Sequence, residues 1–100
     1  MIRYYRFSSR AERDLLTIRA WYDKRGVELT NRFLDELDAA IAGAMERPAS
    51  FPLVRRGVRQ MRLKRFPYRV FFKADESRID ILAIYHTSRN PRRWADPDRE

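Results

Sequence analysis

The side chains best suited to chemistry in this sequence are basic and lie in its second half. Alternation along a strand at residues 58–66 places Arg62 and Lys64 on one face, and Arg69 follows on the next strand beyond a short turn. Adjacent antiparallel strands bring such positions within about 5 to 8 Å of one another. Three cations at that distance repel one another unless a phosphate or carboxylate neutralises them. The pattern therefore predicts a site for an anionic group.

Two kinds of partner could supply that anionic group. In RNA, Arg62 and Lys64 would stabilise the phosphorane formed when a 2′-hydroxyl attacks its phosphate, with His86 or a lysine moving protons and no metal needed. In a protein partner, carboxylates would meet the same cations on an open binding face. His86 ends a strand, a position that favours a capping or core-edge histidine bonded to backbone over a proton-transfer group. The residues alone leave both interpretations open.

The charge distribution favours an acidic partner without identifying it. The chain of 100 residues has a formal net charge of +8, and residues 48–100 hold thirteen basic and six acidic side chains against nine and eight in residues 1–47. Nineteen of the 22 basic residues are arginine, whose planar fork suits bidentate contact with phosphate or carboxylate. Such a surface speeds encounter with nucleic acid or acidic proteins, and it also serves as a solvated face.

Composition argues against several other classes of site. The chain has no cysteine and a single histidine, and it lacks a glycine-rich phosphate loop, a GxSxG elbow and an HExxH motif. We therefore expect no metal and no cofactor. No stretch approaches the roughly 18 apolar residues of a membrane span, and the N-terminus lacks the apolar region of a signal peptide. We expect one cytoplasmic domain over residues 1–100 and no membrane partner.

Apolar periodicity predicts the elements that position these residues. Residues 2–7 are β-branched and aromatic and predict a strand. A helix is expected from Ser9, with Glu12 completing a capping box, to a left-handed cap at Gly26. Its apolar stripe includes Leu16, Trp21 and Tyr22, so the pattern places these three side chains in the core.

A second helix over about residues 28–46 would pair with the first as an antiparallel hairpin. Segments 58–66, 68–75 and 78–86 have strand composition and short connectors, which predicts an antiparallel meander. The expected fold class is α+β: an N-terminal strand, the antiparallel helical hairpin and the three-stranded meander, with both helices packed on one face of the sheet. Residues 90–100 are expected to form an irregular C-terminal tail.

Several pieces of the chain, in this order, resemble the RelE/ParE superfamily of bacterial type II toxins. They are the opening strand, Ala11-Glu12-Arg13-Asp14-Leu15 with Ile18 and Tyr22, Phe33/Leu37/Ile41, Pro48 with Phe51-Pro52, Val58-Arg59-Gln60-Met61, Phe66-Pro67-Tyr68-Arg69-Val70, and His86-Thr87-Ser88-Arg89-Asn90-Pro91 with Trp94. The resemblance implies the RelE-like β-α-α-β-β-β fold. It also implies a toxin held inactive by a cognate antitoxin from the same operon, whose other part often binds operator DNA.

The superfamily divides by target. RelE-like members cut mRNA on the ribosome, and by position their catalytic residues would be Arg62, Lys64, Arg69 and Arg89 here, with His86 a further candidate. Trp94 stands where such nucleases often have tyrosine. ParE-like members poison DNA gyrase without a catalytic set.

The Ala11–Tyr22 helix, the FPY turn and the HxSRxP ending resemble the ParE-like branch more, so a gyrase-poisoning toxin is our leading hypothesis. An mRNA endonuclease and a non-toxic basic interaction module are the alternatives. The residues expected to bind the target or the antitoxin are Arg59, Arg62, Lys64, Arg69, Lys73, Arg89, Arg92, Arg93 and Trp94.

Overall fold

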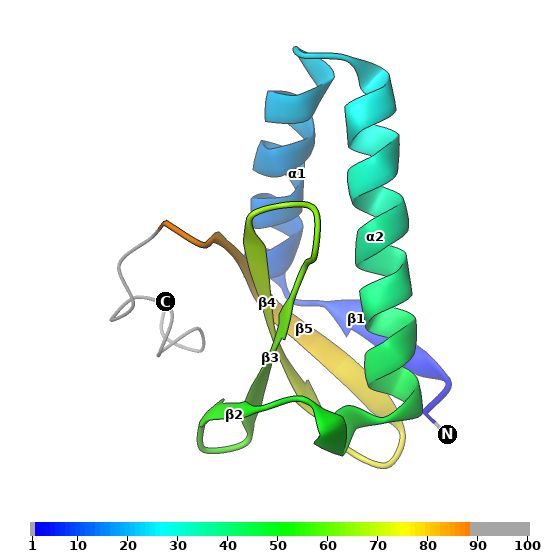
Figure 1. Cartoon of the computed structure of the whole chain (residues 1–100). Helices are drawn as coiled ribbons and strands as arrows, with labels where there is room; N and C mark the ends of the chain where they lie inside the picture. Colours follow the sequence, from blue (N-terminus) through cyan, green and yellow to red (C-terminus); the bar gives the residue numbers. More distant parts are fainter. Residues whose placement is uncertain (1, 89–100) are drawn as a thin grey trace.

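The computed structural model describes residues 2–88, which form a helical hairpin packed on one face of a sheet (Figure 1). In chain order the elements are β1 (Tyr4–Phe7), α1 (Ser9–Asp23), α2 (Val27–Glu46), the short 3-10 helix η1 (Pro48–Ser50), β2 (Leu53–Arg55), β3 (Val58–Arg62), β4 (Tyr68–Ala74) and β5 (Arg78–His86). The predicted α+β class is confirmed. No helix in this part of the chain has the length and apolar character needed to cross a membrane.

The sheet has five strands in the order β1-β5-β4-β3-β2. Strands β3, β4 and β5 form the predicted antiparallel meander, and β1 joins it in parallel to β5. The edge strand β2 was not predicted, because three residues after Pro52 are too few to show alternation. Strand β3 is shorter than predicted, because the Leu63 N–H bonds to the Tyr68 carbonyl at 3.1 Å and the chain turns there.

Helix α1 begins with a cap that differs from the predicted one. Ser8, rather than Ser9, accepts the Ala11 N–H on its Oγ at 3.0 Å. The same hydroxyl donates to the Leu82 carbonyl on β5 at 2.9 Å. Either serine satisfies the local capping pattern. The bond to β5, which sequence alone does not reveal, is made by Ser8 and ties the start of the helix to the sheet.

The break between the helices lies slightly earlier in the chain than expected. Helix α1 ends at Asp23 with Lys24 as its C-cap, and Gly26 is the N-cap of α2, which begins at Val27. Gly26 has a φ of 139°, a backbone conformation that favours glycine. Its N–H bonds to the Tyr22 carbonyl at 3.0 Å. The glycine therefore allows the tight reversal that sets α2 beside α1.

The main core lies between the hairpin and the sheet. Tyr22 is at its centre, with ring centroids 5.7 Å from Phe33 and 5.4 Å from Phe66. Two predicted core residues are instead exposed, Leu16 by 66% and Trp21 by 49%. The prediction was wrong because Ala11, Ile18 and Tyr22 already fill the sheet-facing stripe, and helical geometry turns positions 16 and 21 to either side.

A smaller cluster occupies the opposite face of the sheet, called the far face below. It consists of Val58, Phe71, Ala83 and Tyr85, all at most 2% exposed. A register shift in the β4–β5 pairing lies between Phe71 and Phe72, which are buried on opposite faces. The far face therefore carries a small apolar cluster as well as the cations that alternation places there.

Candidate functional site

Four side chains line up across the far face. Arg62 on β3 lies opposite Arg69 on β4, and Arg69 lies opposite Tyr85 on β5. Arg10 from α1 completes the line, with its guanidinium carbon 4.7 Å from the centroid of the Tyr85 ring. We call Arg62, Arg69, Tyr85 and Arg10 the arginine row. The structure thus brings together two of the three predicted cations and adds Arg10, for which the sequence carried no signal.

The arginine row rests on apolar material. The Tyr85 ring is 2% exposed and lies 5.7 Å, centroid to centroid, from Phe71. Arg69 is half-buried and donates from Nη1 to Gln60 Oε1 at 3.4 Å, while Arg62 is exposed. Directly opposed arginines repel, and their charge acts more strongly next to a low-dielectric cluster. The row can therefore bind a carboxylate or phosphate by bidentate hydrogen bonds.

The other predicted cations on this side are placed differently. Lys64 lies in the loop after β3, outside the paired register. Lys73 is on the far face, opposite Asp80 of β5. The Oδ1 atom of Asp80 is 3.0 Å from Nε of both Arg6 and Arg78. This end of the far face is thus partly neutralised by Asp80.

Arg59 has a structural role on the helix side of the sheet. It pairs in register with Phe72, which belongs to the main core. Its Nη1 donates to the Phe51 carbonyl at 2.7 Å. This bond holds the chain between η1 and β2 against β3. The structure therefore separates Arg59 from the arginine row.

His86 is also on the helix side. It lies opposite Tyr68, with ring centroids 5.3 Å apart, and its Nδ1 accepts the Ser88 N–H at 3.1 Å. The sheet therefore stands between His86 and the arginine row. Alternation held the signal for this separation, because Tyr85, not His86, falls in register with Arg69.

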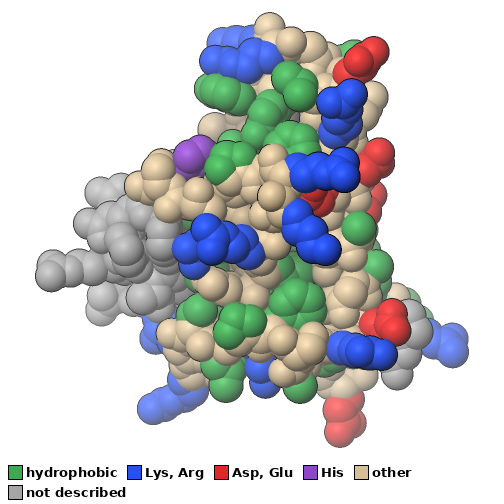
Figure 2. Space-filling model, in the orientation of Figure 1, with side chains coloured by type: hydrophobic (Ala, Val, Ile, Leu, Met, Phe, Trp, Pro, Cys, Tyr) green, Lys and Arg blue, Asp and Glu red, His purple; other side chains and the backbone are tan. Residues whose placement is uncertain are grey.

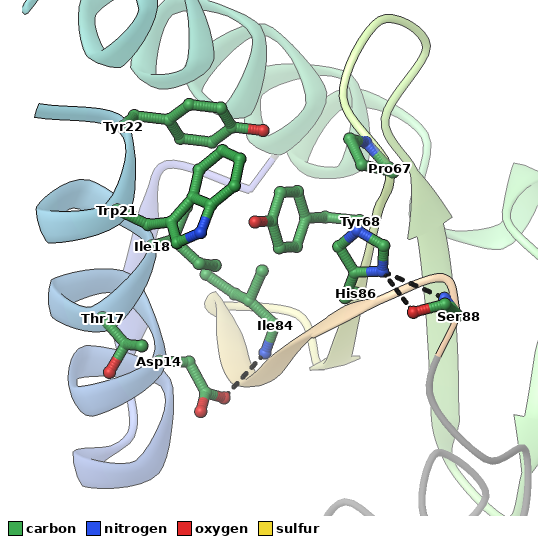
Figure 3. A pocket seen from close by; sticks show the side chains of 10 residues that line it. All are labelled: Asp14, Thr17, Ile18, Trp21, Tyr22, Pro67, Tyr68, Ile84, His86 and Ser88. Carbon is green, nitrogen blue, oxygen red and sulfur yellow. Dashed lines mark hydrogen bonds between the residues drawn. The ribbon is translucent and has the colours of Figure 1, made fainter. Parts of the chain in front are cut away.

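A pocket that the sequence analysis missed opens beside His86. Its volume is about 400 Å³, and it lies between α1 and the adjoining ends of β4 and β5 (Figure 3). Its main walls are Ile18, Trp21, Tyr22, Tyr68, Ile84 and His86. The pocket was missed because Trp21 was assigned to the core.

Two ionisable side chains lie in the pocket walls, Asp14 and Tyr22. Asp14 accepts the backbone N–H of Ile84 on its Oδ2 at 2.9 Å, which joins α1 to the edge of β5 beyond the end of β1. Burial, followed by the neighbouring Tyr68 phenol, raises the pKa of Tyr22 to about 12. The Tyr22 hydroxyl therefore stays protonated throughout the physiological range.

An acidic side chain of α2 positions the loop between β3 and β4. The Glu36 carboxylate accepts the Arg65 N–H, at 3.0 Å from one oxygen and 3.3 Å from the other. The bond anchors the loop that carries Lys64 against the hairpin.

Some predicted residues lie outside residues 2–88, which the structure describes. They are Arg89, Arg92, Arg93 and Trp94, together with the expected tail over residues 90–100. Within the described range, no three histidine, aspartate or glutamate side chains gather to hold a metal ion.

Comparison with known families decides which branch the chain belongs to. The family model described as the ParE toxin of type II toxin–antitoxin systems, parDE, matches residues 5–91. This chain is a member of the ParE toxin family. The match spans both the arginine row and the pocket. It confirms the ParE-like branch of the resemblance, and membership in this family implies a cognate antitoxin.

A solved structure supports the ParE fold. The chain is similar to one from the chromosomal ParDE TA system of P. aeruginosa, with a TM-score of 0.72 at 21% identity. The alignment covers 87% of this chain and 98% of that one. A comparison with curated proteins found no match.

Proposed function

We propose that this ParE-family chain inhibits bacterial growth by poisoning DNA gyrase, that the arginine row is the surface that binds the target, and that the cognate antitoxin neutralises it. Family membership supports the toxin role. The row supplies a cationic surface on an apolar base, which suits an acidic protein surface. Operator DNA would be contacted only through the antitoxin.

Our choice of gyrase over mRNA as the target rests on the separation of the arginine row from His86. RNA cleavage needs a group that moves a proton within hydrogen-bond reach of the reacting phosphate. His86 lies across the sheet from the row. Two other groups in this region could move a proton, but Tyr85 is only 2% exposed and Lys64 lies in the loop after β3. Binding an acidic surface needs charge complementarity alone. The geometry therefore supports an inhibitor that binds more than it supports a nuclease.

A supercoiling assay tests this proposal. Purified chain is added to DNA gyrase and relaxed plasmid, and we expect supercoiling to be inhibited. The double variant Arg62→Ala/Arg69→Ala should need at least about tenfold more protein for equal inhibition, corresponding to about 1.4 kcal/mol of lost binding. The matched control is Arg19→Ala/Arg56→Ala, which removes the same charge from exposed positions elsewhere. It should stay within about twofold of the parent, because distant exposed charges contribute little to binding.

A parallel assay of ribosome-bound mRNA addresses the main alternative. The directly opposed Arg62 and Arg69 could also bind a phosphate of RNA. Cleavage of the mRNA with normal supercoiling would overturn the proposal and favour a RelE-like endonuclease. If expression of the chain alone leaves bacterial growth unchanged, the toxin function fails and the non-toxic interaction module is favoured.

A further inference from the structure

The two edges of the sheet are protected to different degrees. At one edge, β2 is three residues long, follows Pro52 and has a register shift between Leu53 and Arg55. Short length, proline and irregular pairing all keep an edge strand from pairing with another chain. At the opposite edge, β1 keeps a regular register with β5 over its four residues and contains no proline (Figure 1). Strand β1 is therefore the edge that can accept a further strand.

Alternate residues of β1 direct their backbone groups away from β5. The N–H of Ser8, which follows β1 directly, bonds to the Ile81 carbonyl of β5 at 2.9 Å. Successive residues of a strand direct these groups to opposite sides, so the even-numbered residues of β1 face β5. The odd-numbered residues 3, 5 and 7 then face outward. A strand added here would form its hydrogen bonds with these three residues, of which Tyr5 is the middle one.

The side chains along this edge are exposed and aromatic. Tyr4 is 69% exposed and Tyr5 is 45% exposed. Tyr5 is on the helix side, where its ring lies edge-on to Phe7 with 6.0 Å between the ring centroids. Tyr4 is on the far face, opposite Arg78 of β5. Because tyrosine is enriched in protein interfaces, both faces of this edge offer contact area to a partner.

Charge limits which partner can use this edge. The chain carries a formal net charge of +8, and Figure 2 shows basic side chains over much of the face that it presents. Two copies therefore repel one another unless their contact avoids opposing like charges. At the edge itself, the Oδ1 atom of Asp80 lies 3.0 Å from the Nε atom of Arg6. Asp80 thus offsets part of the charge where a second copy would approach.

An antiparallel pairing of β1 with itself, centred on Tyr5, meets this condition. In that register residue 3 of each copy lies opposite residue 7 of the other, so all the outward-facing residues are paired. Arg6 lies opposite Tyr4 of the second copy on the far face, and Arg3 lies opposite Phe7 of the second copy on the helix side. Each cation therefore faces an aromatic ring, which is a favourable contact, and no two cations are directly opposed.

We propose that β1 is a self-association edge, at which a second copy of this chain adds its own β1 antiparallel, with Tyr5 opposite Tyr5. The contact is isologous, since both copies use the same strand. The self-complementary register, in which rings meet cations about one central residue, favours a second copy over a foreign strand. The contact is small, so the association is weak and depends on concentration.

The pairing would set two arginine rows on one side of a continuous sheet. The two-fold axis of an antiparallel strand pair is perpendicular to the sheet, so the far faces of both copies point the same way. Strand β1 pairs with residues 78–81 of β5, whereas the row crosses β5 at Tyr85, so the new contact does not use the row. Two rows on one body would increase the avidity for a target with two binding sites. Only this consequence rests on the proposed function, and the pairing does not.

Cysteine cross-linking tests the register, because the chain has no cysteine of its own. Tyr5→Cys places one thiol from each copy at a hydrogen-bonded pair, with Cα atoms about 5.5 Å apart, which a disulfide can span. Tyr4→Cys is the matched control. Its two thiols belong to residues on a diagonal of about 7–8 Å, beyond the usual reach of a disulfide. Each variant is incubated with oxidised glutathione, and the linked dimer is followed on non-reducing gels.

We expect Tyr5→Cys to form the linked dimer at least about tenfold faster than Tyr4→Cys. Random collision predicts the opposite order, because Tyr4 is the more exposed residue. In concentrated urea the two rates should become equal, since the preference needs the folded strand.

Sedimentation equilibrium measures the strength of the self-association. Tyr5→Lys and Leu53→Lys each add one positive charge at an exposed position, on opposite edges of the sheet. Tyr5→Lys sets two like charges directly opposite each other, so it should weaken the dimer at least about tenfold. Leu53→Lys should weaken it less than about threefold. A circular dichroism spectrum checks that each variant is folded.

Several outcomes would overturn the pairing. A parent chain that stays monomeric up to about 1 mM, equal cross-linking rates for the two folded cysteine variants, or equal losses for the two lysine variants would each do so. Protection of the Tyr5→Cys thiol from alkylation by the protein encoded beside this gene, without self-association, would assign the edge to that partner instead. The supercoiling assay keeps the two proposals apart: a chain that leaves gyrase active yet pairs through β1 loses the proposed function and retains the pairing.

Discussion

The two faces of the β4–β5 pair are built from the same strands but differ in what they carry. On the helix side, Phe72 packs within a core that includes both helices and faces Phe51 at 5.7 Å between ring centroids. On the far face, the adjacent Phe71 belongs to a cluster of four buried residues beneath two opposed arginines. One face is built mainly by apolar contact. The other leaves like charges facing each other on a small apolar base.

The residues that stabilise the fold therefore lie mainly on the helix side, and the far face is the surface available to a partner. Polar groups at the helix side are satisfied by specific partners, such as the Ile84 N–H by Asp14 and the Arg65 N–H by Glu36. Opposed cations on neighbouring strands reduce stability. Local rules of this kind are most often broken at functional sites, where a ligand compensates. The direct opposition of Arg62 and Arg69 is the reason why we propose the arginine row as a binding surface.

The largest expected effect compares the two phenylalanines directly. Both are at most 1% exposed, on consecutive positions of β4. Phe72→Ala should lower the free energy of unfolding by about 4–5 kcal/mol and Phe71→Ala by about 3 kcal/mol, because the smaller cluster can collapse more easily around a cavity. Urea unfolding at pH 7 measures both values. An equal or larger loss for Phe71→Ala would mean that the far face contributes as much to stability as the helix side.

A smaller effect is expected where α1 meets the edge of β5. Asp14→Ala leaves the Ile84 N–H without its carboxylate partner, so the free energy of unfolding should fall by about 1–3 kcal/mol. Asp38→Ala removes the same charge from an exposed position on α2, and it should change the free energy of unfolding by no more than about 0.5 kcal/mol. Thermal and urea unfolding compare the two variants. If the two variants have the same free energy of unfolding, the bond between Asp14 and the Ile84 N–H does not stabilise the helix side.

The smallest effect is a dependence on alkaline pH confined to the helix side. The pKa of Tyr22 is about 12 in the fold and near 10 in an unfolded chain, so its contribution is fully present below pH 10. As the pH rises from 10 towards 12, the unfolded chain ionises while the folded one stays neutral, and stability falls.

Tyr22→Phe keeps the ring and removes the ionisation. At pH 7 it should change stability by no more than about 1 kcal/mol. Between pH 9 and pH 11 it should lose less stability than the parent, as measured by urea unfolding at each pH. Tyr4→Phe, at an exposed position on β1, serves as the control and should lose as much as the parent.

Particular residues show how far the sequence could be used to predict the structure. Helix α2 and the strands of the meander followed from periodicity, because each depends on neighbours along one helix or strand. The meeting of Arg62 and Arg69 followed from alternation plus a short turn. Arg10 could not be predicted, because it reaches the far face from a helix that is distant in the chain.

The sequence by itself determined the α+β class, the helical hairpin and a pair of facing arginines, since local spacing encodes all three. The tertiary structure alone decided that Ser8 caps α1, that β1 lies parallel to β5, and that Trp21 lines a pocket. These features depend on contacts between segments up to 74 residues apart, which no local pattern specifies.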